Sequence, residues 1–117
     1  MNIGDVVWVE FPAGAGRAQA GRRPSIVAQI SPVSAALPTV LLIPLTSQQD
    51  ALRFPGTVLV EPDASNGLRR PSVALVFQLT AIDKRFLASP QLGAVSPAVM
   101  AAVWEALDEI TGRAGFS

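Results

Sequence analysis

Apolar and polar residues alternate along the first part of the chain with the two-residue period of a β-strand. Between Asp5 and Phe11, the side chains of Val7, Val9 and Phe11 share one face, which predicts a strand with one apolar side. Ten prolines and nine glycines divide the following residues into short apolar runs. These runs predict further strands at Ser25–Ile30, Thr39–Leu45, Thr57–Glu61, Ser72–Leu79 (able to continue to Ile82) and Leu92–Val95.

The run from Thr39 to Leu45 is almost entirely apolar, which predicts a strand that is covered on both faces. Pro44 lies inside this run and has no backbone N–H to donate to a neighbouring strand. We therefore expect an edge position or a bulge at Pro44.

The last segment changes to the period of a helix. Ser96 is a suitable N-cap, Pro97 suits the first helical position, and Gly112 suits the position just after a helix. Apolar residues recur between them at helical spacing, at Val99, Met100, Val103, Trp104, Leu107 and Ile110. Five or six short strands followed by one amphipathic helix predict a mainly β fold with a C-terminal α-helix, a small bent sheet or barrel rather than a βαβ fold.

The length and composition limit the class of protein. The 117 residues suit a single domain, residues 1–117. The start of the chain has no basic region of a signal peptide, and its longest apolar run, Val40–Leu45, is too short to span a membrane. We therefore expect a soluble cytoplasmic protein without a membrane segment.

The missing residue types restrict the chemistry. The chain has no cysteine and no histidine, which excludes zinc–thiolate sites, thiolate nucleophiles and Ser-His-Asp triads. The formal net charge is zero, which does not indicate a nucleic-acid binder. The charges are nevertheless unevenly placed: three of the eight arginines lie between Pro12 and Arg23, where there is no acid, and the helix from Pro97 to Thr111 has three acids and no base.

Three polar features stand out from this apolar chain. Arg22 and Arg23 follow a glycine-rich loop, and the planar guanidinium group suits phosphate, although two exposed surface charges would give the same pattern. Hydroxyl and amide groups follow the third strand from Thr46 onward, where they could bind phosphate or make a local turn. Gln78 is a lone amide between two apolar residues, which fits either a binding group or an outward-facing side chain.

The chain also contains an internal echo. The segment Gly21-Arg22-Arg23-Pro24-Ser25-Ile26-Val27 is similar to Leu68-Arg69-Arg70-Pro71-Ser72-Val73-Ala74, and in each a basic pair and a proline lead into a predicted strand. A duplicated unit would need a longer repeat. We interpret the echo as two similar strand starts.

Six blocks in order carry a resemblance to a known family. They are Gly4-Asp5-Val6-Val7-Trp8-Val9-Glu10-Phe11-Pro12, the first segment of the echo, Pro44-Leu45-Thr46-Ser47, the stretch from Gly67 to Val76, Gln78-Leu79-Thr80-Ala81-Ile82-Asp83-Lys84, and Gly93-Ala94-Val95-Ser96 with the terminal helix. Together they span essentially the whole chain, which resembles the MazF/PemK family of toxin endoribonucleases.

The resemblance implies a small SH3-like β-barrel that forms a homodimer and cuts single-stranded RNA at short sequence motifs, with no metal or other cofactor. It implies a cognate MazE-like antitoxin that covers the active-site groove, and a mobile flap from Pro12 to Gly21. It also implies that Arg23 is catalytic and that Thr46 is its partner. We expect five further residues to bind the RNA substrate: Arg17, Arg22, Ser47, Gln48 and Gln78.

Such a reaction is compatible with the missing residue types. Cleaving RNA through its own 2′-hydroxyl requires alignment and charge stabilisation at phosphorus, which Arg23 and Thr46 can supply. An arginine keeps its proton at physiological pH, so we assign Arg23 an electrostatic role and assign no residue as general base.

One residue departs from the family pattern. Many members have an acid just before the glutamine of the fifth strand, where this chain has Phe77. We expect Phe77 to be a core residue, with a surface for base stacking as the alternative. Two other functions stay open: a toxin of the same fold that poisons DNA gyrase by binding, and a non-catalytic binding domain that lost its activity with the acid.

Overall fold

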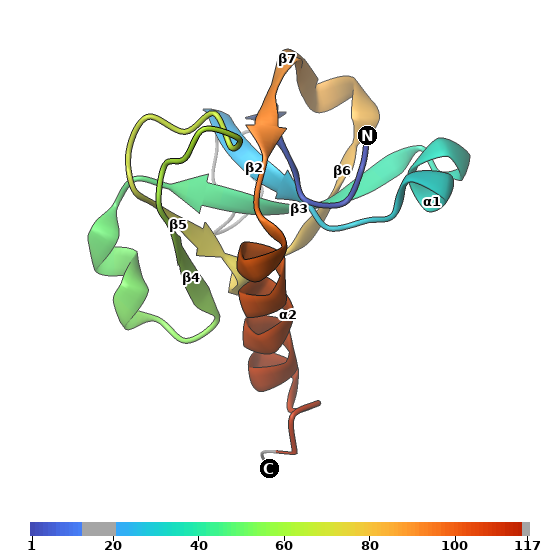
Figure 1. Cartoon of the computed structure of the whole chain (residues 1–117). Helices are drawn as coiled ribbons and strands as arrows, with labels where there is room; N and C mark the ends of the chain where they lie inside the picture. Colours follow the sequence, from blue (N-terminus) through green and yellow to red (C-terminus); the bar gives the residue numbers. More distant parts are fainter. Residues whose placement is uncertain (13–20, 116–117) are drawn as a thin grey trace.

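The computed structural model describes residues 1–12 and 21–115 of the chain. Figure 1 shows short, strongly bent strands that cross one another in the view, with one long C-terminal helix beside them. The strands are β1 (Asp5–Phe11), β2 (Gly21–Val27), β3 (Thr39–Thr46), β4 (Thr57–Val60), β5 (Ser72–Leu75), β6 (Thr80–Asp83) and β7 (Leu87–Ala94). The helices are α1 (Ser31–Ala36) and α2 (Pro97–Thr111), with short 3₁₀ turns η1 (Gln49–Arg53), η2 (Val76–Gln78) and η3 (Lys84–Phe86).

The strands pair in the order β4-β5-β3-β2-β1-β7, and β6 also pairs with β3. All pairs are antiparallel, and β4 and β7 form the two ends of this order. Strand β3 is therefore central: β2 lies along one edge of it, and β5 and β6 lie along the other. The predicted mainly β fold with a C-terminal helix is confirmed.

Pro44 lies where the second edge of β3 changes its partner. Strand β5 pairs with Leu45 and Thr46 of β3, whereas β6 pairs with the residues from Thr39 to Leu42. The three-residue turn η2 separates β5 from β6. The predicted long strand Ser72–Leu79 is thus wrong, because it is interrupted opposite Pro44. Strand β3 is central, so the expected edge position is wrong, and what lies opposite Pro44 is the turn η2 rather than a bulge. A proline cannot donate to a ladder, so an interruption is tolerated here at little cost.

Two apolar clusters share the strands β1, β2 and β3. Val7, Val9 and Phe11 of β1 are buried in the smaller cluster, as their alternation predicted, whereas Val6 is buried in the larger one. Both faces of β3 are covered, which confirms the prediction from its apolar run. The larger cluster extends to α2 through Val103.

Helix α2 has the predicted ends. The Ser96 hydroxyl accepts a hydrogen bond from the Val99 amide (3.2 Å), and Gly112 is left-handed with φ 76°. Other boundaries differ: β2 begins at Gly21 rather than Ser25, and β7 begins at Leu87 rather than Leu92. Helix α1 and turn η1 have too few residues to show a helical period, so the apolar pattern did not reveal them.

Candidate active site

The pairing of β2 with β3 brings the two expected catalytic residues to one place. Ser25 lies opposite Pro44, and continuing this register by two residues places Arg23 opposite Thr46. Because antiparallel strands run in opposite directions, the start of β2 meets the end of β3. Arg23 and Thr46 are therefore neighbours at one end of the sheet, although they lie far apart in the sequence.

Arg23 is half-buried, and its Nε atom is buried with no hydrogen-bond partner among residues 1–12 and 21–115. The Oε1 atom of Gln78 is in the same state. A buried polar atom without a partner costs about 1–3 kcal/mol, so such atoms call for an explanation. Both residues line one cavity.

The Thr46 hydroxyl is fixed by the turn that follows it. Its Oγ1 atom accepts a hydrogen bond from the Gln48 amide (3.2 Å), and only 7% of the residue is exposed. The local turn was one of the two interpretations of this segment. The bond leaves the hydroxyl proton free to donate, because a threonine hydroxyl can accept and donate at the same time.

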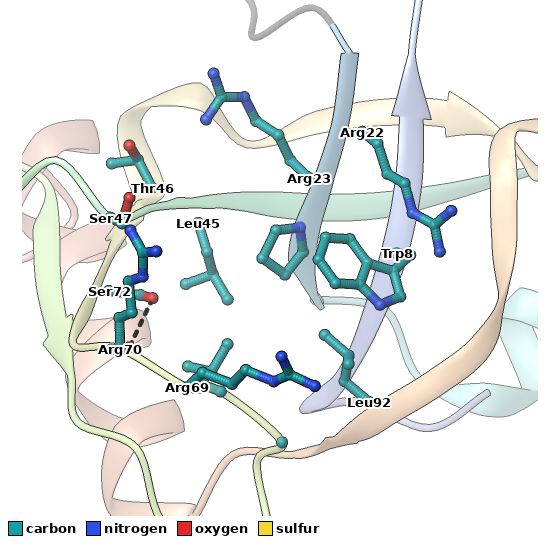
Figure 2. A pocket seen from close by; sticks show the side chains of 13 residues that line it. Trp8, Arg22, Arg23, Leu45, Thr46, Ser47, Arg69, Arg70, Ser72 and Leu92 are labelled. Atoms are coloured by element: carbon teal, nitrogen blue, oxygen red, sulfur yellow. Dashed lines mark hydrogen bonds between the residues drawn. The ribbon is translucent and has the colours of Figure 1, made fainter.

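A first cavity of about 500 Å³ opens beside this pair, and we call it the basic cavity (Figure 2). Four arginines line it, together with hydroxyl groups and an apolar floor: Arg22, Arg23, Arg69, Arg70, Thr46, Ser47, Ser72, Trp8, Pro24, Leu45, Leu68 and Leu92, with Gly67 at its edge. No acidic side chain lines it in the described part of the chain. The Arg22 guanidinium lies over the Trp8 ring, 5.0 Å from its centroid. Both residues line the basic cavity.

A second cavity of about 320 Å³ lies on the other side of the pair, and we call it the aromatic cavity. It also contains Arg23 and Thr46, and its other lining residues are Gln48, Asp50, Ala51, Phe54, Leu75, Phe77 and Gln78. Arg23 and Thr46 are the two residues common to both cavities. A strand of nucleic acid that crosses this pair can therefore occupy a cavity on each side.

The expectation that Phe77 is a core residue is wrong. Phe77 is 41% exposed, and its ring packs edge-on against Phe54 with the centroids 5.8 Å apart. The turn η2 explains the difference: it interrupts the strand just before Phe77 and directs Phe77 and Gln78 to the aromatic cavity instead of the core. Gln78, for its part, does not lie on a strand.

The structure brings most of the expected site residues together. Arg22, Arg23, Thr46 and Ser47 line the basic cavity, and Gln48 and Gln78 line the aromatic cavity. Arg17 lies outside the described residues, as does most of the expected flap.

Sequence reasoning missed three further groups at the site: Trp8, the Arg69–Arg70 pair and the Phe54 ring. A signal existed for the arginine pair, since the echo of the Arg-Arg-Pro-Ser motif marks it. The alternation of β1 predicted that Trp8 lies on the other face of the strand from Val7 and Val9. It did not show that this face borders the basic cavity.

Two further observations concern metals and membranes. Within the described residues, no three histidine, cysteine, aspartate or glutamate side chains are grouped so that they could hold a metal ion. No helix in residues 1–12 and 21–115 is long and apolar enough to cross a membrane.

Comparisons with known proteins give consistent matches. Residues 2–111 match the family described as PemK-like, MazF-like toxin of type II toxin-antitoxin system. The chain is 30% identical over 96 residues to the endoribonuclease toxin MazF of Escherichia coli (strain K12), over 82% of this chain and 80% of that protein.

The same fold occurs in solved structures. MazF (form I) from Deinococcus radiodurans has a TM-score of 0.80 and 28% identity, and the match covers 96% of each chain. A MazE–MazF structure (form II) from the same organism has a TM-score of 0.74 and 27% identity, again over 96% of each chain. The family match over nearly the whole chain, with the relative from Escherichia coli, shows that this protein belongs to the PemK-like, MazF-like toxins of type II toxin–antitoxin systems.

Proposed function

We propose that this toxin is an endoribonuclease that cuts single-stranded RNA, including mRNA, without a metal ion, and so arrests translation and growth. Its reaction centre is Arg23 with Thr46. One observation carries the proposal: Arg23 and Thr46, at the start of β2 and the end of β3, are the two residues that line both cavities. A phosphate bound at this pair would lie where the two cavities meet.

The RNA supplies its own nucleophile. The 2′-oxygen attacks the neighbouring phosphorus, the bond from phosphorus to the 5′-oxygen of the next nucleotide breaks, the 2′ proton is released and the 5′-oxygen gains a proton. Negative charge grows on the two non-bridging oxygens during this step. Arg23 stabilises that charge through its planar fork of donors, and Thr46 donates one further hydrogen bond.

The remaining expected residues bind the strand on each side of the cleaved bond. Arg22 and Ser47 face the basic cavity, where they contact the RNA backbone. Gln48 and Gln78 face the aromatic cavity, where the free Oε1 atom of Gln78 accepts a hydrogen bond from a base. We assign Arg17 to the same groove on the sequence alone.

The partners follow from the family. The MazE–MazF structures from Deinococcus radiodurans pair toxins of this fold with MazE. We propose that a MazE-like antitoxin binds this toxin, that the toxin forms a homodimer, and that the whole chain, residues 1–117, acts as one domain. The proposed substrate places the toxin in the cytoplasm.

The test is cleavage of a purified transcript pool in the presence of EDTA, with the product ends mapped by sequencing. We expect wild type to cut at a short motif. Arg23→Ala should lower the rate by about 10²–10³-fold or more, as expected for the loss of a group that stabilises the transition state, and should remain a folded dimer by size-exclusion chromatography. Arg85→Ala is the matched control, because Arg85 is an exposed arginine paired with Asp83 and lines neither cavity.

Two outcomes would contradict the proposal. If Arg23→Ala cut RNA at the wild-type rate, the assigned mechanism would be wrong. If wild type left RNA intact but inhibited purified DNA gyrase, the toxin would act by binding instead.

A further inference from the structure

Resting on the proposed function, we propose that Arg69 and Arg70 form a second phosphate-binding subsite for RNA, opposite Arg22 and Arg23 across the basic cavity. The subsite holds a backbone phosphate next to the cleaved bond. The Arg-Arg-Pro-Ser motif occurs twice in the chain, and the reaction centre uses only the first copy. The proposed subsite gives the second copy a role.

The topology explains why the two motifs meet. Strands β2 and β5 pair with opposite edges of β3, and both are antiparallel to it. The start of β2 and the segment just before β5 must therefore both lie at the end of β3, near Thr46 and Ser47. The start of β2 carries Arg22 and Arg23, and the segment before β5 carries Arg69 and Arg70. The echo thus places two basic pairs on either side of the same strand end.

Figure 2 shows both pairs around the cavity. Arg70 extends up the left of the view toward Ser47, and Arg69 extends along the bottom toward Leu92. All four arginines line the same cavity, whose volume of about 500 Å³ falls in the usual range for ligand sites of about 300–1,000 Å³.

The two arginines lack a counter-ion. The ion pairs of the described residues are those of Arg53 with Asp50, Arg85 with Asp83, and Arg113 with Asp108. Neither Arg69 nor Arg70 takes part in any of them. Four like charges around an acid-free cavity repel one another, and an anion between them removes that repulsion.

The loop that leads to Arg69 is rigid, which favours a preorganised site. Asn66 is buried, its Nδ2 donates to the Glu61 carbonyl (2.9 Å), and its Oδ1 accepts from the Leu68 amide (3.0 Å). Asp63 accepts from the amides of Ser65 (2.7 Å) and Asn66 (2.8 Å). Because the backbone is already ordered, little conformational entropy is lost when the arginines bind phosphate.

The ligand is an RNA phosphodiester rather than an isolated anion. The cavity combines guanidinium groups at its rim with the apolar side chains of Leu45, Leu68 and Leu92. A nucleotide has both parts, a charged phosphate and a flat apolar base, and the cavity is continuous with the reaction centre through Arg23 and Thr46. An acidic peptide would use the arginines but would leave this apolar floor without a matching group.

The experiment measures RNA binding without cleavage. The probe is a short fluorescein-labelled oligonucleotide of mixed sequence that is 2′-O-methylated throughout, so that the nucleophile is blocked. Dissociation constants are measured by fluorescence polarisation for wild type, for Arg69→Ala/Arg70→Ala, and for Arg85→Ala/Arg113→Ala. The last variant removes the same number of charges from exposed sites outside both cavities.

We expect the Arg69→Ala/Arg70→Ala variant to bind roughly tenfold more weakly, and its plot of log affinity against log salt to be flatter by about 1.4, since each contact with a single strand contributes about 0.7. The control variant should keep the wild-type slope within about 0.3. Arg69→Lys/Arg70→Lys should recover most of the slope, because it keeps the two charges. The thermal midpoint of each variant shows that it is folded.

The outcomes separate this inference from the proposed function. If wild type cuts RNA but the Arg69→Ala/Arg70→Ala variant binds the probe with the wild-type slope, the subsite is wrong and the nuclease stands. If that variant instead loses affinity for an acidic antitoxin peptide alone, the arginines serve the antitoxin and the RNA subsite is again wrong. If wild type neither cuts RNA nor binds the probe, both fail together.

Discussion

The Thr46 hydroxyl has one observed role and one proposed role, and a single hydroxyl can fill both at once. Its oxygen accepts the Gln48 amide and so shapes the turn after β3, while its proton remains available for a phosphate oxygen. Valine has the shape of threonine but no hydroxyl, so Thr46→Val removes both bonds, whereas Thr46→Ser keeps both. The pair of substitutions therefore separates the hydroxyl from the methyl group.

We expect Thr46→Val to lower the single-turnover cleavage rate about 10²–10³-fold, the usual effect of losing one preorganised donor. Stability should fall by only about 1 kcal/mol, because Gln48 is exposed and water can replace the lost acceptor. Thr46→Ser should recover most of the rate. The rates are measured with excess enzyme on a labelled RNA, and equal rates for Val and Ser would show that the hydroxyl plays no part.

Phe77 is the residue at which this chain departs from its family. Its exposed ring, packed edge-on against Phe54 beside the reaction centre, forms an aromatic surface in the place where many members have an acid. We interpret this surface as a platform for an RNA base, because every base can stack on an aromatic ring.

Phe77→Leu should weaken binding of the 2′-O-methylated probe by about 1–3 kcal/mol, the usual contribution of one stacked base. Leu59→Ala is the control, since Leu59 is similarly exposed but lines neither cavity. Unchanged affinity for Phe77→Leu would rule out stacking. A gain of cleavage by Phe77→Glu in a protein that is otherwise inactive would instead support a toxin that lost its activity with the acid.

At the scale of elements, the turn η2 determines where Phe77 and Gln78 lie. Composition alone indicates a continuous strand here, and most of that strand does exist as β5 and β6 along one edge of β3. The three residues of η2 are excluded from pairing opposite Pro44. Pro44 was a sequence signal for an interruption, but it did not show that the neighbouring chain would be interrupted by a turn between two strands.

The loop between β4 and β5 is the second element that builds the site, and a close backbone approach holds it against β7. Gly67 has φ 71°, and a Cβ there would meet the Leu92 carbonyl well inside van der Waals contact. The Ala94 amide donates to the Ser65 carbonyl (2.9 Å) across the same contact. The position of the Arg69–Arg70 pair therefore depends on a glycine that touches no substrate.

Gly67→Ala should destabilise the fold by about 2–4 kcal/mol, the sum of an unfavourable positive φ and a backbone clash. Gly115→Ala is the matched control: it has φ 93° but a Cβ there would meet nothing within 4 Å, so only the cost of the positive φ, about 1 kcal/mol, should appear. Urea denaturation measures both. Equal losses of stability would mean that the loop does not pack closely on β7.

At the scale of the whole molecule, the zero net charge is an average over unlike regions. The basic cavity gathers four of the eight arginines and no acid of the described residues, whereas helix α2 carries Glu105, Asp108 and Glu109 and no base. A local field of this kind attracts a polyanion even when the chain is neutral overall. A net charge of zero therefore does not exclude the proposed RNA substrate.

The sequence by itself determined the local properties of this protein. Periodicity determined most strands, the caps determined both ends of α2, and the ordered motifs identified the family. The same motifs led to the prediction that Arg23 and Thr46 form the reaction centre. These properties depend on residues that are close in the chain, so a pattern within one segment is enough to reveal them.

Only the tertiary structure decided which distant segments share a surface. The placing of both arginine pairs at the end of β3, and of Phe77 beside Phe54, follows from which edges of β3 the strands β2, β5 and β6 occupy. Strand order and register are set by packing between residues far apart in the sequence, and no single segment carries that information. The repeated arginine motif was thus visible in the sequence, while its place at one cavity came from the fold.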